Sequence, residues 1–83
     1  MRTDGLTWRV VDGEVIVLDV PGRVYLAGNH TAALLWEALA EGARTDELVA
    51  RVVDEFGIDP ETASRDVDHF LEELRKRGLL DGP

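Results

Sequence analysis

The first third of the chain carries its apolar residues in short runs that predict β-strands. Residues 6–11 are rich in β-branched and aromatic side chains, and Asp12-Gly13 after them is a strong hairpin signal. Residues 14–20 are apolar on both faces, which predicts a strand covered on both sides. Pro21-Gly22 then makes a turn into a third, shorter strand at residues 23–27. Two tight turns predict a three-stranded antiparallel meander, in which the third strand is an edge.

Three segments with apolar residues at helical spacing follow. The first covers residues 31–40, begins after Asn29 as N-cap and ends before Gly42. The second is expected to have Thr45 as its N-cap and to end at Gly57. Its apolar stripe consists of Leu48, Val49, Val52, Val53 and Phe56.

The third helix has the most complete start signal, with Asp59 as N-cap and Pro60 in the first helical position. It ends at Gly78, after which Leu79 and Leu80 are expected to pack back onto the protein. Its apolar stripe consists of Ala63, Val67, Phe70, Leu71 and Leu74. The order β-β-β-α-α-α predicts a single α+β domain over residues 1–83, with the helices on one face of the sheet, similar to winged-helix modules.

The charge of the chain bears on its partners. With 17 acidic and 9 basic residues the formal net charge is −8, which argues against nucleic acid and anionic membrane surfaces as ligands. No apolar run approaches the roughly 20 residues of a membrane span, and no signal peptide is visible. The 83 residues include no cysteine, which suits a reducing compartment. The charge permits cationic or neutral partners, but the preferred interpretation is that it only maintains solubility. A cytoplasmic protein is expected.

A search for catalytic chemistry finds little. Ser64 and His69 are five residues apart, roughly 140° around a helix, so they do not form a nucleophile–base pair. Asp66, His69 and Glu73 share one helix flank and resemble a partial metal site, but His30 is the only other histidine. A solvated acidic flank is the preferred interpretation. We expect no catalytic residue, no metal and no cofactor.

The edge strand at residues 23–27 is the most informative element. If the third helix lies beside it, the two enclose a groove, and an extended peptide could add as a fourth strand. Phe70 and Val67 would then form the apolar floor. The charged rim that would select among peptides consists of Asp66, Glu73 and Arg77. From the pattern alone, the favoured interpretation is instead that Phe70 is core and the flank is only solvated, since apolar helix residues usually belong to the core.

Motifs along nearly the whole chain resemble those of the PqqD-like family, the leader-binding modules known as RiPP recognition elements, where RiPP denotes a ribosomally made, modified peptide. Tyr25-Leu26-x-x-Asn29-x-Thr31-Ala32 leads into the first helix, and Leu39-x-Glu41-Gly42 closes it. Thr45 then opens the next helix, and Phe56-Gly57-Ile58-Asp59 links it to the last. Val67-x-x-Phe70-Leu71-x-x-Leu74-x-x-x-Gly78-Leu79-Leu80 completes the resemblance. Their order and spacing are more specific than any one of them.

The resemblance implies a winged-helix-like fold that binds a precursor leader as an extra strand between the third strand and the third helix. It implies no catalytic residues. The peptide-binding positions that it implies are Val24, Tyr25, Leu26, Ala27, Asp66, Val67, Phe70, Glu73 and Leu74. A chain of this length is most similar to the discrete recognition proteins of lasso-peptide pathways, which work with a leader peptidase and a cyclase. A radical-SAM or cyclodehydratase pathway stays open.

Three other classes of function were weighed. A generic protein–protein adaptor shares the fold and differs only in what fills the groove. A winged-helix DNA-binding regulator needs a basic recognition helix, whereas the first turns of the third helix are acidic. A small hydrolase needs a nucleophile or metal site that these residues do not assemble. The partners that the resemblance implies are a precursor leader peptide and a leader peptidase or other maturation enzyme.

Overall fold

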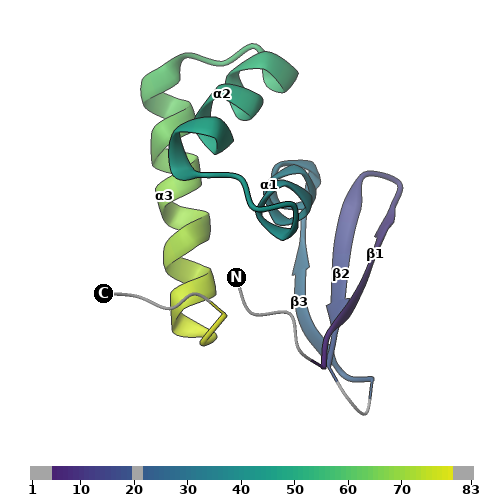
Figure 1. Cartoon of the computed structure of the whole chain (residues 1–83). Coiled ribbons are helices and arrows are strands. Elements are labelled where there is room, and N and C mark those ends of the chain that lie inside the picture. Colours follow the sequence, from purple (N-terminus) through teal and green to yellow (C-terminus); the bar gives the residue numbers. More distant parts are fainter. Residues whose placement is uncertain (1–4, 20–21, 80–83) are drawn as a thin grey trace.

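The computed structural model describes residues 5–19 and 22–79. In chain order the elements are β1 (Thr7–Val11), β2 (Glu14–Leu18), β3 (Val24–Gly28), α1 (His30–Ala40), α2 (Thr45–Phe56) and α3 (Pro60–Lys76) (Figure 1). This order confirms the predicted β-β-β-α-α-α arrangement. The expected end of the second strand at Val20 and the expected packing of Leu80 lie outside the described residues. Among the described helices, none is long and apolar enough to cross a bilayer.

The three strands form an antiparallel sheet in the order β1-β2-β3, so β3 is an edge. Asp12 and Gly13 connect β1 to β2 with φ values of 52° and 79°, as a two-residue hairpin turn with positive φ requires. Gly13 is needed for a second reason. A Cβ built on it would lie 2.2 Å from the imidazole of His30, the first residue of α1.

A bulge interrupts the pairing of β3 with β2. Val17 pairs with Leu26 and Leu18 pairs with Val24, which leaves Tyr25 without a partner in β2. The extra residue breaks the alternation of side chains along the strand. Tyr25 and Leu26 both pack into the cluster under the helices, whereas Val24 is 66% exposed. The bulge therefore brings two consecutive side chains of the edge strand to the helical side.

The helices cover one face of the sheet (Figure 1). Val15 and Val17 of β2 are fully buried on that face, but Ile16 between them is 38% exposed. The prediction that this strand is covered on both sides is therefore wrong. The physical reason is that α1 packs on the Val15 side, and no described element packs on the Ile16 side.

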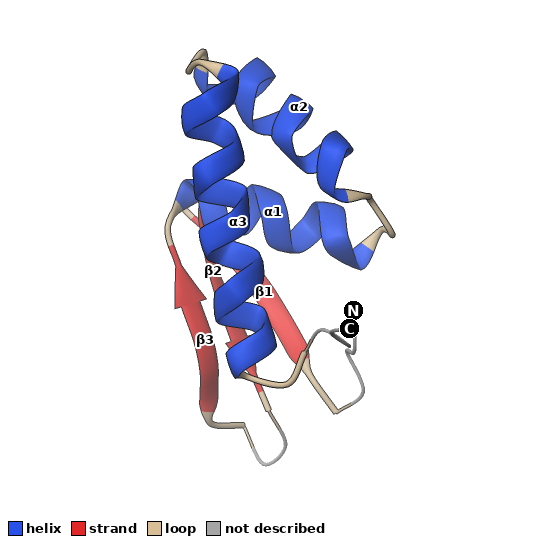
Figure 2. Cartoon of the chain, turned by 90° about the vertical axis from the view of Figure 1, so that its left-hand side faces the viewer, coloured by secondary structure: helices blue, strands red, loops and turns tan. Residues whose placement is uncertain are grey.

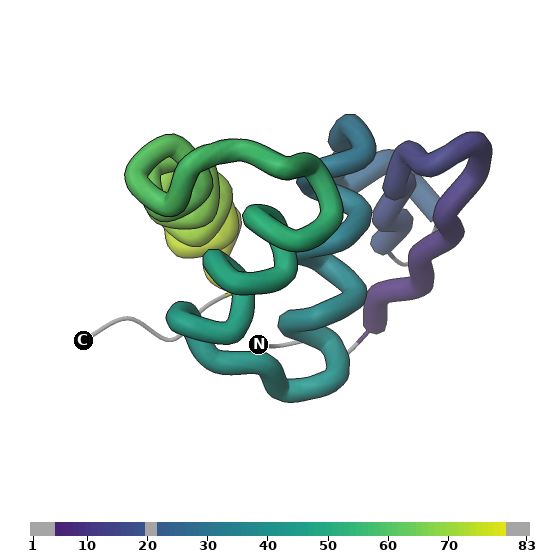
Figure 3. The backbone as a smooth tube through the Cα atoms, turned by 90° about the horizontal axis from the view of Figure 1, so that it is seen from above, coloured from purple at the N-terminus to yellow at the C-terminus, as the bar shows by residue number. Residues whose placement is uncertain are grey.

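The core has two parts, joined through α1. The sheet-side cluster consists of Val15, Val17, Leu26, Ala33, Trp36, Leu74 and Leu79. The helix-side cluster consists of Leu35, Ala38, Leu48, Val52, Ala63, Val67 and Leu71. In the view from above, α1 lies between the sheet and the other two helices (Figure 3). Leu39 and Phe70 pack against both clusters. The apolar stripe of α2 is buried at Leu48 and Val52 but leaves Phe56 38% exposed at the end of the helix.

The helix starts follow the capping signals at two of the three sites. The Asn29 side chain accepts a hydrogen bond from the Ala32 N–H at 3.1 Å, and the Asp59 carboxylate accepts one from the Thr62 N–H at 2.8 Å. The bond from the Thr62 N–H holds the pKa of Asp59 below its ordinary value, because it favours the ionised form.

The expected N-cap of α2 was wrong by one residue. Arg44 is the N-cap, and Thr45 is the first helical residue. The Arg44 N–H donates to the Glu47 carboxylate at 2.9 Å. Because the arginine side chain carries no acceptor, the Glu47 half of a capping box supports this helix start. The carboxylates of Asp46 and Glu47 in the first turn also favour the helix dipole.

Candidate functional site

The third helix runs alongside the edge strand, as the groove hypothesis requires (Figure 2). Two hydrogen bonds between Tyr25 and Arg77 join the end of α3 to the start of β3. The Arg77 Nη1 donates to the Tyr25 backbone carbonyl at 2.7 Å, and the Tyr25 hydroxyl donates to the Arg77 carbonyl. Leu79 is buried in the sheet-side cluster directly after this contact. The end of α3 is thus held at one end of the edge strand.

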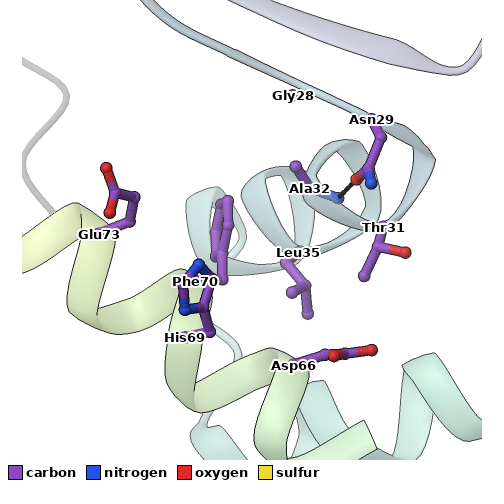
Figure 4. A pocket seen from close by; sticks show the side chains of 9 residues that line it. All are labelled: Gly28, Asn29, Thr31, Ala32, Leu35, Asp66, His69, Phe70 and Glu73. Carbon is purple, nitrogen blue, oxygen red and sulfur yellow. Dashed lines mark hydrogen bonds between the residues drawn. The ribbon is translucent and has the colours of Figure 1, made fainter.

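A groove of about 360 Å³ lies toward the other end of β3 (Figure 4). Three elements line it: the end of β3 with the residue after it, the first turns of α1, and the middle of α3. Its lining residues are Gly28, Asn29, Thr31, Ala32, Leu35, Asp66, His69, Phe70 and Glu73. The groove therefore lies mainly between α3 and the start of α1, and β3 reaches it only at Gly28.

The apolar part of the groove centres on Phe70. Its ring is half-buried and projects from α3 toward α1, where Ala32 and Leu35 line the same space (Figure 4). Gly28 allows β3 to approach α1 closely, since a Cβ built on Gly28 would lie 2.4 Å from the Ala32 Cβ. Apolar groups of this kind can bury the side chain of a ligand, which is the main source of binding free energy in such a groove.

The polar rim is mostly acidic. Asp66 and Glu73 each lie one helical turn from His69 on the flank of α3, and all three line the groove. Glu73 lies 3.6 Å from the Arg77 guanidinium, whereas Asp66 forms no ion pair with another described residue. Across residues 5–19 and 22–79, no three His, Cys, Asp or Glu side chains gather closely enough to hold a metal ion. The rim offers hydrogen-bond acceptors to a peptide.

Of the nine predicted binding residues, Asp66, Phe70 and Glu73 are brought together in the groove. The four predicted β3 residues differ in exposure: Val24 and Ala27 are exposed, Tyr25 is half-buried and Leu26 is 7% exposed.

Val67 and Leu74 of α3 are fully buried and do not line the groove. The expectation that Val67 forms the floor is corrected: its side chain belongs to the helix-side cluster, as does that of Leu35, and Ala32 lines the groove beside Phe70. Val67 and Leu74 support the groove from beneath, since a fully buried side chain has no surface to offer a ligand.

The contribution of α1 is the part of the site that the sequence argument missed. Gly28, Thr31 and Leu35 were assigned to a strand break and an ordinary helix. The motif Asn29-x-Thr31-Ala32 was the available signal, because it begins at the N-cap that fixes the start of α1 against the edge strand. His69 was noted on the same flank as Asp66 and Glu73 but was given no part in the groove.

The fold and the groove define a class: a winged-helix-like α+β protein with an edge strand and a groove that lies between its last helix, the start of its first helix and the end of that strand. The chain belongs to the PqqD family, because the family model described as coenzyme PQQ synthesis protein D (PqqD) matches residues 14–80. It is a PqqD-like RiPP recognition element, as the sequence motifs predicted.

Two solved structures are similar over most of the chain. "TbiB1 in Complex with the TbiA(beta) Leader Peptide" is 29% identical with a TM-score of 0.82, and the match covers 100% of this chain and 98% of that one. "Lasso peptide synthetase B1 complexed with the leader peptide" is 22% identical with a TM-score of 0.74, covering 90% of this chain and 88% of that one, and it supports the fold. A search of curated protein sequences gave no significant match.

Proposed function

We propose that this protein binds the leader segment of a ribosomally made precursor peptide and performs no chemistry on it. The observation that carries the proposal is the groove between α3, the start of α1 and the end of β3, in a fold that matches a leader-peptide complex at a TM-score of 0.82. The leader adds to β3 as a fourth strand. Main-chain hydrogen bonds to the free edge supply affinity, and side chains that enter the groove supply specificity.

Each part of the groove has a distinct role in this proposal. Phe70, with Ala32, receives an apolar side chain of the leader, and the buried Leu35 supports them from beneath. Asp66 and Glu73 accept hydrogen bonds or pair with a basic residue beside it. Of the nine predicted residues, Tyr25, Leu26, Val67 and Leu74 act by shaping the strand and supporting the helix. Ala27 contributes backbone groups to the edge, and Val24 lies at the start of β3.

The bound leader is delivered to a maturation enzyme, which we propose to be the leader peptidase or cyclase of a lasso-peptide pathway in the cytoplasm. Holding a precursor on a protein that also contacts the enzyme converts their encounter into an intramolecular one. The effective concentration then reaches about the millimolar range for a short connection. Delivery of this kind needs no catalytic residue on the recognition protein itself.

The test is a fluorescence-polarisation titration of the whole chain. The labelled probes are synthetic leader peptides whose precursor genes neighbour the gene for this protein. The TbiA(beta) leader is a second probe. We expect saturable binding to a neighbouring leader and none to its scrambled version. Circular dichroism on the same sample verifies that the protein is folded.

Two outcomes separate this proposal from the adaptor alternative. Binding to a leader but not to its scrambled form supports leader recognition. If the folded protein binds none of the leaders, the groove serves another protein, and the adaptor interpretation replaces the present one. Affinity purification with the whole chain as bait then becomes the way to find that partner.

A further inference from the structure

The two ends of the edge strand differ in what they offer to an incoming peptide. At the Gly28 end the groove is open. At the other end, the Arg77 guanidinium already donates to the Tyr25 carbonyl at 2.7 Å. Glu73 lies 3.6 Å from the same guanidinium, and the Tyr25 hydroxyl donates back to the Arg77 carbonyl. The carbonyl at this end of β3 is thus occupied by the protein's own side chain.

The occupied carbonyl belongs to the bulged residue. Tyr25 has no Cα partner in β2, and its carbonyl accepts the Arg77 side chain at the end of β3 away from the groove. Proteins blunt sheet edges with bulges, with charged side chains or by covering them, and at Tyr25 a bulge and an arginine coincide. Uninterrupted strand geometry remains at Leu26–Gly28, three residues that span about 10 Å.

We infer that Arg77 is a specificity-determining residue that stops strand addition at Tyr25. The inference rests on the proposed function, because the added strand is the leader. The leader pairs with β3 between Leu26 and Gly28 and leaves the edge before it reaches Val24. The protein therefore selects leaders whose extended segment is short. The same stop leaves Val24 without a partner in the leader, although Val24 belongs to β3 and is 66% exposed.

The test maps where β3 becomes protected when a peptide binds. Backbone amide exchange is measured by NMR on the isotope-labelled whole chain, with and without the neighbouring leader peptide that gave saturable binding. In the wild-type protein we expect newly protected amides within Leu26–Gly28 and none at Val24 or Tyr25. In Arg77→Ala we expect the protection to extend to Val24 or Tyr25, because the carbonyl and the edge beside it are released.

Two variants serve as controls. Arg75→Ala removes a neighbouring arginine that pairs with Glu72 at 3.2 Å on the same helix, and it should keep the wild-type pattern. Tyr25→Phe removes the hydroxyl contact but leaves Arg77 on the carbonyl, so extended protection in this variant would assign the stop to the hydroxyl and overturn the role of Arg77. A general loosening of α3 would instead change exchange along the whole helix.

The inference and the proposed function fail in different ways. If wild-type protein binds the leader and protection already includes Val24 or Tyr25, Arg77 is no stop, even if Arg77→Ala does not fold. An unchanged pattern in a folded Arg77→Ala protein overturns the inference as well. If no leader binds wild-type protein at all, the proposed function itself has failed.

Discussion

At the scale of single residues, the groove depends on a few side chains whose surroundings differ. Asp66 is exposed on the rim and forms no ion pair with another described residue, so its charge is free to act on a ligand. Val67, next in the chain, is fully buried. Adjacent positions on α3 thus separate the groove rim from core packing, and substitutions of the exposed position can be interpreted without a loss of core.

Asp66→Lys is expected to weaken leader binding about fivefold, roughly 1 kcal/mol, because it removes an acceptor from the rim and places a long side chain there. The free energy of unfolding should change by less than about 0.5 kcal/mol, as for other exposed sites. Fluorescence polarisation and urea unfolding measure the two effects. Asp68→Lys makes the same charge change at an exposed α3 position outside the groove and should leave affinity unchanged. Equal effects of the two variants would remove Asp66 from the site.

Gly28 is the residue on which the approach of β3 to α1 depends. In Gly28→Ala the new Cβ would meet the Ala32 Cβ at 2.4 Å, so strand and helix must separate. We expect a loss of about 1–3 kcal/mol in the free energy of unfolding, as for other overpacked sites. Urea unfolding measures it.

The matched test for this clash is a double-mutant cycle with Ala32→Gly. That change alone costs up to about 1 kcal/mol through helix propensity, but it removes the atom that the Cβ added in Gly28→Ala would strike. The double variant should therefore be more stable than the sum of the two single effects predicts, by at least about 0.5 kcal/mol. Additive effects would mean that the close contact does not limit this position.

At the scale of elements, α3 combines a strong start with an end fixed on the sheet. Its N-cap Asp59 accepts hydrogen bonds from the Thr62 N–H at 2.8 Å and from the Thr62 hydroxyl at 3.0 Å. These bonds, with the nearby Arg65 charge, lower the pKa of Asp59 in the folded protein. A lowered pKa means that ionised Asp59 stabilises the fold above the unfolded pKa of about 3.9. The contribution is lost as the pH falls through the folded pKa.

Asp59→Ala should therefore lower the thermal midpoint at pH 7 and lower it progressively less as the pH falls below about 4. Thermal unfolding followed by circular dichroism from pH 7 to pH 2.5 gives the comparison. Asp68→Ala, at an exposed aspartate of the same helix that is not its N-cap, serves as the matched control. A deficit for Asp59→Ala that stays constant down to pH 2.5 would contradict the role of the ionised cap.

The elements themselves could be predicted from local signals, and their surroundings could not. Local signals predicted the N-caps Asn29 and Asp59 and the Asp12-Gly13 turn, and the structure confirms all three. The apolar character of Ile16 did not reveal that no described element covers its face of the sheet. The apolar pattern gives the type of each side chain but not which element packs on it. The Tyr25 bulge is likewise a product of pairing with β2.

The groove shows the same division. Asp66, Phe70 and Glu73 could be predicted because they share one flank of a single helix. Leu35 and Ala32 could not, since their part in the site depends on the angle at which α1 leaves the strand. Val67 was assigned to the floor because it neighbours Phe70 on the helical projection, and the packing of α2 and α1 against it decided otherwise.

At the scale of the whole molecule, α1 and α3 connect the two core clusters. Trp36 of α1 belongs to the sheet-side cluster and Leu35 beside it to the helix-side cluster. Phe70 and Leu39 pack against both. The groove residue at the centre of the proposed site is therefore also one of the links between the halves of the core. Disruption of one cluster should therefore destabilise the other.

Unfolding is accordingly expected to be a single cooperative transition, as it is for most chains of this size. Tryptophan fluorescence reports on the sheet side, where the rings of Trp8 and Trp36 lie 5.5 Å apart in an edge-to-face arrangement. Far-ultraviolet circular dichroism follows all the helices, and α2 with most of the α3 core positions belongs to the helix-side cluster. The two urea curves should share one midpoint, and a saturating leader should move both equally. A fluorescence midpoint separate from the dichroism midpoint would mean that the clusters unfold independently, and that chain 1–83 does not behave as a single domain.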